Sequence, residues 1–170
     1  MNIEIEIEKA KKGDKEAFTK IMHSYEQDLY KIAKTRLQKQ EDIEDAFQET
    51  MLEAFRYVNR LRENSYFKSW LIKILINKCN KIYKKNKTNL IFLEEIKDEK
   101  LHTELSENEL EFDSLLSSLK YEEKIIMVLY YSLDYTTKEI AKILGRNENT
   151  VKTIIKRSKE KIRKDLEVKN

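Results

Sequence analysis

Apolar residues recur at steps of three and four along most of this 170-residue chain, which is the period of amphipathic α-helices. In the first half, the pattern predicts one helix after Asp14, a second from about Asp42 and a third over residues 69–83. The segment RLRENSYFKS (60–69) breaks the period and predicts a loop. We therefore expect a compact domain of three or four helices over residues 1–85.

The pattern changes in the middle of the chain. Residues 86–109 have weak periodicity and many acidic side chains, so we expect a flexible acidic linker there. From Leu110 the helical period returns, and residues 110–170 predict a second domain of four helices. The predicted fold is therefore all-α, with two small helical domains joined by the linker. A content of two glycines and no proline agrees with it, because a turn-rich β fold needs more of both.

The segment KEIAKILGRNENTVKTIIKRS (138–158) carries the local signals of a helix-turn-helix. Thr136 and Glu139 stand at the spacing of a capping box, so the first of the two helices should begin there. Gly145 can end that helix in a left-handed conformation, and Asn147 can cap the next one. In a helix-turn-helix the outward-facing residues early in the second helix enter the major groove, so this segment predicts DNA binding.

Charge is distributed in blocks along the chain, although the net charge is only +3. Residues 71–87 and 146–164 are basic, whereas residues 91–111 are acidic. Any one block could be a solvated helix face. Two basic blocks with an acidic one between them instead favour two contacts with a polyanion and a region that is kept away from it.

Nothing in the sequence predicts catalysis, a metal site or a cofactor. His23 and His102 are isolated from other candidate ligands, and the many acidic residues are accompanied by no nucleophile, glycine-rich phosphate loop or metal-ligand spacing. Cys79 is the only cysteine, so an intrachain disulfide is impossible, which suits a reducing compartment. The chain has no signal-peptide pattern and no apolar run near the roughly 20 residues that span a bilayer. We expect a cytoplasmic protein that is not an enzyme and does not insert into a membrane.

Two further motifs precede the helix-turn-helix. They are DIEDAFQETMLEAFR (42–56) and RLRENSYFKSWLIKILINKCNKIYKK (60–85). With these motifs in this order and an acidic segment before the helix-turn-helix, the chain resembles the bacterial RNA polymerase sigma factors, in particular the small extracytoplasmic-function (ECF) subgroup. The resemblance covers almost the whole chain and implies a region 2 domain followed by a region 4 domain.

The resemblance, read together with the residue chemistry, implies three sets of contact residues. The acidic helix would dock on core polymerase through Asp42, Asp45, Gln48 and Glu49. The loop and the next helix would read and open the promoter −10 element through Arg62, Asn64, Ser65, Tyr66, Lys73, Asn77, Asn80 and Lys84. The helix-turn-helix would read the −35 element through Arg146, Glu148, Asn149, Thr150, Lys152, Thr153, Lys156 and Arg157.

Aromatic residues near the loop have two alternative roles, in the core or against unstacked bases. We expect Phe47, Phe55 and Trp70 in the core, leave Phe67 open between the two roles, and expect Tyr66 to stack on a base.

The same resemblance implies partners. They are the clamp helices of the largest polymerase subunit, the flap of the second largest, promoter DNA, and an anti-sigma factor that is often membrane-bound. The sequence departs from the family pattern at Met51, Lys81 and Lys120, which replace an aromatic residue, an Asp and a Pro respectively. A free-standing helix-turn-helix regulator with an N-terminal interaction domain is the main alternative, and an enzyme acting on nucleic acid is a third.

Overall fold

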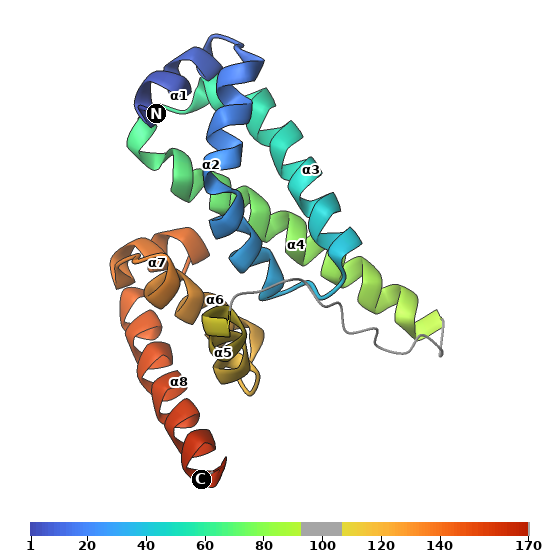
Figure 1. Ribbon diagram of the computed structural model, residues 1–170, viewed down its shortest axis with the longest axis vertical. Helices are drawn as coiled ribbons and strands as arrows, with labels where there is room; N and C mark the ends of the chain where they lie inside the picture. The colour runs from blue at the N-terminus through green and yellow to red at the C-terminus, as the bar shows by residue number, and fades with distance from the viewer. Residues whose placement is uncertain (93–106, 170) are drawn as a thin grey trace. The chain divides into compact units, whose positions relative to one another are not determined.

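The computed structural model describes residues 1–92 and 107–169, and within these residues the chain is helical with no strand (Figure 1). The chain divides into two compact units, Met1–Asp98 and Glu99–Asn170. Each unit has its own apolar core. The predicted all-α fold with two small helical parts is confirmed.

Over residues 1–92, the N-terminal unit has four helices and two 3₁₀ turns. They are α1 (Ile3–Lys11), α2 (Lys15–Lys34), α3 (Gln40–Tyr57), η1 (Val58–Arg60), η2 (Asn64–Tyr66) and α4 (Phe67–Phe92). Helix α4 packs against α2 and α3, and α1 packs against α2 and both 3₁₀ turns. Asp14 caps α2 as the sequence predicts, since its Oδ1 accepts a hydrogen bond from the Ala17 N–H at 3.0 Å.

Helix α1 was not assigned from the sequence, where Ile and Glu alternate with a period of two. In the structure the buried residues of this segment follow a helical spacing instead. Ile7 and Ala10 are buried three positions apart, whereas Ile5 is exposed. Asn2 caps the helix, and its Oδ1 accepts from the Glu4 and Ile5 N–H groups. Ion pairs between Glu6 and Lys9 and between Glu8 and Lys11 stabilise the helix on its surface.

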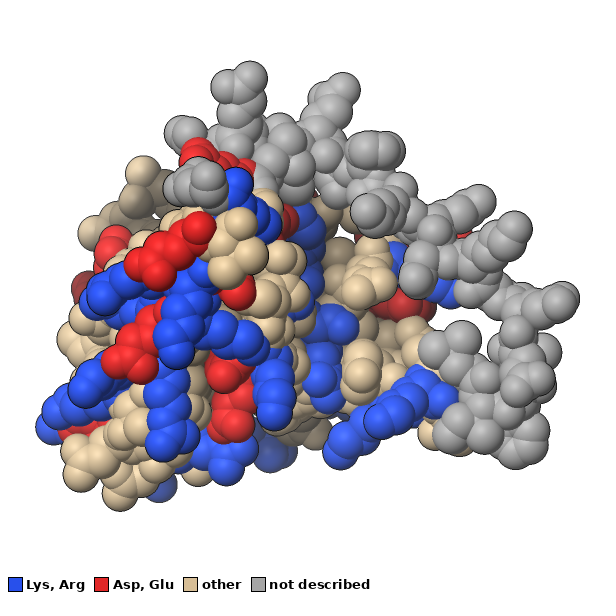
Figure 2. All heavy atoms as spheres, turned by 90° about the horizontal axis from the view of Figure 1, so that it is seen from below, with Lys and Arg blue, Asp and Glu red and all other residues tan. Residues whose placement is uncertain are grey.

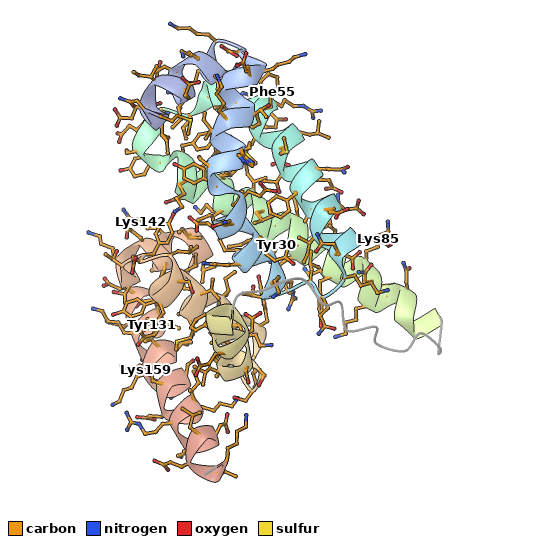
Figure 3. All side chains as sticks on the ribbon, in the orientation of Figure 1. Tyr30, Phe55, Lys85, Tyr131, Lys142 and Lys159 are labelled. Carbon is orange, nitrogen blue, oxygen red and sulfur yellow. The ribbon has the colours of Figure 1, made fainter. Side chains whose placement is uncertain are left out.

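The core of the N-terminal unit lies between α2, α3 and α4. Its fully buried side chains include Ile21, Leu29, Ile32, Ile43, Phe67, Leu71, Ile72 and Leu75. Phe55, labelled in Figure 3, meets Phe18 edge-on with a centroid distance of 5.2 Å, which joins α2 to α3. Cys79 is also buried, and burial raises the pKa of its thiol to about 12, so it stays protonated and inert.

Helix α4 extends past the predicted end of its domain, to Phe92. Contacts made by its second half explain the extension. The Asn86 Nδ2 donates to Asp42 Oδ2 of α3 at 2.8 Å, and the Arg36 guanidinium lies 3.7 Å from the centroid of the Tyr83 ring. The start of the predicted linker is therefore helical. Residues 93–106, the middle of that linker, lie outside the described residues.

In the described part of the C-terminal unit, residues 107–169, there are four helices and a π-helical turn. They are α5 (Glu107–Leu116), α6 (Tyr121–Met127), η3 (Val128–Ser132), α7 (Thr137–Leu144) and α8 (Glu148–Lys169). Helices α6 and α7 both pack on α8. Lys120, which replaces the family's proline, donates its backbone N–H to Glu123 Oε2 at 2.7 Å, a bond that proline could not make.

The helix-turn-helix forms from α7 and α8 with the caps that the sequence predicts. Thr136 Oγ1 accepts from the Glu139 N–H, and the Glu139 carboxylate accepts from the Thr136 N–H at 2.8 Å. Gly145 ends α7 in the left-handed region, at φ +63°. Asn147 Oδ1 then accepts from the Asn149 N–H at 2.8 Å and starts α8.

Candidate functional site

The acidic helix α3 presents one face to solvent. Asp45, Gln48 and Glu49 are exposed on it, at steps of three and one, whereas Ile43 and Ala46 face the core. Asp42 is only half-buried and is held by Asn86 of α4. Of the four predicted docking residues, three therefore lie free of the core and the fourth is engaged by a neighbouring helix.

Two residues at this face were not predicted from the sequence, Leu52 of α3 and Lys78 of the neighbouring helix α4. Leu52 is 69% exposed and continues the stripe one helical turn after Gln48. Lys78 of α4 approaches Glu49, with Nζ 3.8 Å from Oε2, and pairs more closely with Glu53. The face thus combines carboxylates with one large exposed apolar side chain. The three- and four-residue spacing could have identified Leu52, but no local signal identifies Lys78.

The loop between α3 and α4 carries the predicted −10 residues. Arg62, Ser65 and Tyr66 are exposed, and Tyr66 exposes 56% of its surface. Asn64 is different, since its Nδ2 donates to Glu8 Oε1 of α1 at 2.7 Å and its Oδ1 is buried with no hydrogen-bond partner. The loop therefore offers solvent an aromatic ring and a guanidinium, while its asparagine points toward protein.

The roles of the neighbouring aromatic residues are now clear. Phe67 is 1% exposed and stacks on Tyr25 with a centroid distance of 6.2 Å, so it belongs to the core. Trp70 lies 5.8 Å from Phe67 and is half-buried, as are Phe47 and Phe55. The expectation of core positions for these three aromatic residues is met only in part.

An open pocket of about 380 Å³ lies beside the loop. Its lining residues come from α3, the loop and α4, and they are Glu53, Tyr57, Arg60, Leu61, Arg62, Trp70 and Ile74. The Arg60 guanidinium lies 4.8 Å from the Tyr57 ring centroid. Tyr57 and Arg60 were not among the predicted residues, because nothing in the sequence indicates that the end of α3 reaches Trp70.

The polar stripe of α4 contains the remaining predicted −10 residues. Lys73, Asn77 and Lys84 are exposed at steps that keep them on one side of the helix. Asn80, on the same stripe, is half-buried with its Oδ1 buried and without a hydrogen-bond partner. Lys81, which replaces the family's Asp, is exposed and adds a positive charge next to this stripe.

The start of α8 presents most of the predicted −35 residues to solvent. Those that are exposed are Arg146, Asn149, Thr150, Lys152, Thr153, Lys156 and Arg157. In Figure 2 basic side chains, with acidic ones between them, cover the part of the surface that α8 forms at the left. Lys142 of α7 and Lys159 of α8, both exposed, project away from the ribbons in Figure 3.

Glu148 is the exception in this set. Its Oε1 accepts from Thr137 Oγ1 of α7 at 2.8 Å and pairs with Lys152 Nζ at 3.2 Å. The Thr137 hydroxyl and then Lys152 hold the pKa of the Glu148 carboxyl below its usual value. Arg146 also has a partner, since its Nε lies 2.7 Å from Glu122 Oε1 of α6. These contacts join α6, α7 and α8 at the turn.

Within residues 1–92 and 107–169, no helix combines the length and apolarity needed to cross a membrane. In the same residues, no three His, Cys, Asp or Glu side chains gather closely enough to hold a metal ion.

Two family models match the chain in the order of the two units. Residues 21–88 match Sigma-70 region 2, and residues 109–162 match Sigma-70, region 4. The first match contains the α3 face, the loop and the α4 stripe, and the second contains the helix-turn-helix. The class of protein defined by this pair is a sigma-70-type polymerase subunit.

Curated relatives narrow the class. The RNA polymerase sigma factor SigV of Bacillus subtilis is 30% identical over 93% of this chain and 96% of its own length. The ECF sigma factor SigM of Mycobacterium tuberculosis strain H37Rv is 26% identical over 88% of this chain and 77% of its own. The chain therefore belongs to the ECF sigma factors, which direct promoter-specific initiation of transcription and are not enzymes.

Solved structures share the fold. CnrH in complex with the cytosolic domain of CnrY superposes with a TM-score of 0.72 at 20% identity, over 98% of this chain and 97% of that one. RpoE of Bartonella quintana, in complex with the anti-sigma factor NepR, superposes with a TM-score of 0.76 at 19% identity, over 90% of this chain and 98% of that one.

Proposed function

We propose that this sigma factor divides its task between its two units. The N-terminal unit binds core polymerase through α3 and reads and opens the −10 element, while the C-terminal unit reads the −35 element. The observation that carries this proposal is the pocket lined by Arg62 and Trp70, because it lies in the same unit as the exposed acidic face of α3. The proposed domains correspond to the predicted ranges 1–85 and 110–170, with α4 and α5 continuing into the ends of the predicted linker.

The docking surface on α3 is formed by Asp45, Gln48, Glu49 and Leu52. Its carboxylates suit a basic helical partner, which we take to be the clamp helices of the largest polymerase subunit. Leu52, exposed one helical turn after Gln48, supplies an apolar contact of the kind that dominates binding energy once water is excluded. Asp42 supports this surface through Asn86 instead of contacting the partner directly. For the C-terminal unit we propose the flap of the second-largest subunit as the contact.

Opening of the −10 element requires bases to leave the stack. A side chain with an exposed ring can hold such a base, and base–aromatic stacking contributes about 1–3 kcal/mol. Tyr66, which is exposed in the loop, provides that ring. The pocket that Arg62 of the same loop lines falls within the range of about 300–1,000 Å³ typical of small-molecule sites. Its Arg and Trp lining fits an extruded base. Lys73, Asn77 and Lys84 would then follow the backbone of the displaced strand.

Recognition of the −35 element rests on α8. Asn149, Thr150, Lys152 and Thr153 are exposed in its first two turns, where a recognition helix contacts base edges. Lys156 and Arg157 follow, at positions that suit phosphates. Glu148 orients α8 against α7 through Thr137, so we assign it a supporting role instead of a base contact.

We further propose that the protein acts in the cytoplasm by binding alone, without catalysis, and that an anti-sigma factor restrains it. Two proteins of the same fold are found in complexes that support this, RpoE with the anti-sigma factor NepR and CnrH with the cytosolic domain of CnrY. On this proposal the partner is anchored to a membrane and covers the DNA and polymerase surfaces until a signal releases the sigma factor.

The test is reconstitution. The purified chain is added to sigma-free core polymerase, and run-off transcription is measured on a genomic library. Specific initiation from a defined set of promoters is expected. Repression without initiation would support a free-standing helix-turn-helix regulator instead.

A further inference from the structure

Helix α1 contacts the loop that carries the −10 residues. The contact joins Glu8 and Asn64, which are 56 residues apart in the chain, and its N–O distance is 2.7 Å. Helix α1 also packs on both 3₁₀ turns, of which η1 precedes the segment 62–66 and η2 forms its second half. The region 2 family match begins at residue 21, so α1 lies outside it.

The chemistry of this contact fixes the direction in which Asn64 points. A carboxylate only accepts hydrogen bonds, so the Asn64 amide nitrogen must face Glu8 and its oxygen must face inward. The oxygen is indeed buried and has no hydrogen-bond partner. The bond to Asn64 is also the largest cause that holds the pKa of Glu8 below its usual value, followed by the bond to Lys11.

The local charge also suits a loop that meets DNA. A carboxylate beside the loop would repel phosphates, but Lys11 Nζ lies 3.2 Å from Glu8 Oε1 and balances it. Glu8 therefore acts on the loop at short range without adding a net negative charge there.

We propose that Glu8 is a positioning residue for promoter opening, and that α1 braces the segment 62–66 through its bond to Asn64. This inference rests on the proposed −10 function. The bond holds the backbone of the loop so that Tyr66 and Arg62 face solvent beside the pocket. Asn64 therefore stabilises the conformation of the loop through its bond to Glu8 and does not contact a base.

The test compares three variants of the full chain in reconstituted holoenzyme. Glu8→Ala removes the contact, Glu8→Gln keeps an acceptor for Asn64, and Glu4→Ala removes a matched carboxylate from the same helix with no contact to the loop. Open complexes are measured by permanganate footprinting on a promoter recovered from the run-off library. We expect Glu8→Ala to lower open-complex formation about three- to tenfold, as loss of one partly exposed hydrogen bond allows. Glu8→Gln and Glu4→Ala should stay near the parent, and core binding and thermal melting should not change.

A charge swap separates positioning from direct reading of a base. The double variant Glu8→Lys with Asn64→Asp restores the contact with donor and acceptor exchanged. Promoter opening should therefore recover relative to Glu8→Lys alone. Glu4→Lys controls for the added positive charge. Amide hydrogen exchange of residues 62–66 should rise in Glu8→Ala and fall back in the swap. The inference is overturned if Glu8→Ala opens promoters as well as the parent does. It is also overturned if the double variant loses as much open-complex formation as Asn64→Asp alone. In both cases the proposed function stands. A parent holoenzyme that opens no promoter overturns the proposed function, and the inference with it.

Discussion

The two DNA-binding surfaces of this sigma factor are built in different ways. In the C-terminal unit, the recognition residues stand on one helix within about three turns, and the turn before it is closed by local caps. In the N-terminal unit, the loop and pocket combine α1, the end of α3, two 3₁₀ turns and α4. The first surface can be recognised from a short stretch of sequence, whereas the second exists only after distant segments have packed together.

The docking face on α3 should show the largest effect, because binding to core polymerase precedes every use of the N-terminal surface. Reversing Asp45 and Glu49 to Lys should weaken core binding at least about tenfold, since like charges would then meet a basic partner. Reversing Glu16 and Glu26, which are exposed on α2, changes the net charge equally and serves as the control. Affinity is measured by titration against labelled core enzyme.

The distinction between the two DNA-binding surfaces would be weakened if reversing Asp45 and Glu49 also changed binding of the full chain to a −35 duplex. The two units would then not be separable in function, or the N-terminal unit would have misfolded. Circular dichroism melting distinguishes these two outcomes.

Tyr66 tests the surface that is built from distant segments. Tyr66→Ala should lower open-complex formation by about tenfold, within the range of about 1–3 kcal/mol for one base–aromatic stack, and should leave closed-complex binding nearly unchanged. Tyr66→Phe is the matched control, because it keeps the ring. Permanganate reactivity of promoter thymines reports opening, and a gel-shift on the closed complex reports binding. An equal loss in both would argue against a role in opening.

The sequence predicted the features that depend on local residues and missed those that depend on distant segments packing together. The caps at Thr136, Gly145 and Asn147 were all predicted, because each depends on residues no more than four positions away. The face of α3 was predicted for the same reason, through a helical spacing that also includes Leu52.

The parts that were missed depend on tertiary contact. Helix α1 carries a period-two alternation, and it is its packing on α2 that selects the Ile7–Ala10 stripe. The second half of α4 has few apolar residues, and Asn86 and Tyr83 stabilise it through α3 and Arg36. Asn64 was predicted as a DNA contact from its place in the loop, and only the structure reveals its bond to Glu8.

Lysine substitutions on α8 sharpen the description of the local surface. Lys152→Ala or Lys156→Ala should weaken −35 binding several-fold, and a lost phosphate contact should reduce the slope of log K against log salt by about 1. Lys169→Ala, at the far end of the same helix, is the matched control. A lower affinity with an unchanged slope would indicate a base contact instead. Fluorescence anisotropy at several salt concentrations measures both quantities.

The smallest effect is expected from the cap that closes the helix-turn-helix, and it tests whether this surface is locally stabilised. The Thr136 N–H, and then its hydroxyl, hold the pKa of the Glu139 carboxyl below its usual value. A carboxyl with a depressed folded-state pKa adds stability above its unfolded pKa, and this stability is lost as the pH falls through the folded value. Thermal stability of the C-terminal unit should therefore fall on acidification below the ordinary glutamate range. Glu139→Gln should flatten that dependence.

Thr136→Ala removes the other half of the cap and should cost about 0.5–2 kcal/mol of stability at neutral pH. Thr19→Ala is a matched control, because its hydroxyl bonds only to the Lys15 carbonyl of its own helix. Melting followed at pH 7 and at a pH below the ordinary glutamate range measures both effects. If Thr136→Ala lowered open-complex formation as strongly as Tyr66→Ala does, the cap would act on more than its own unit. The two surfaces would then be coupled, although their sites are built from separate parts of the chain.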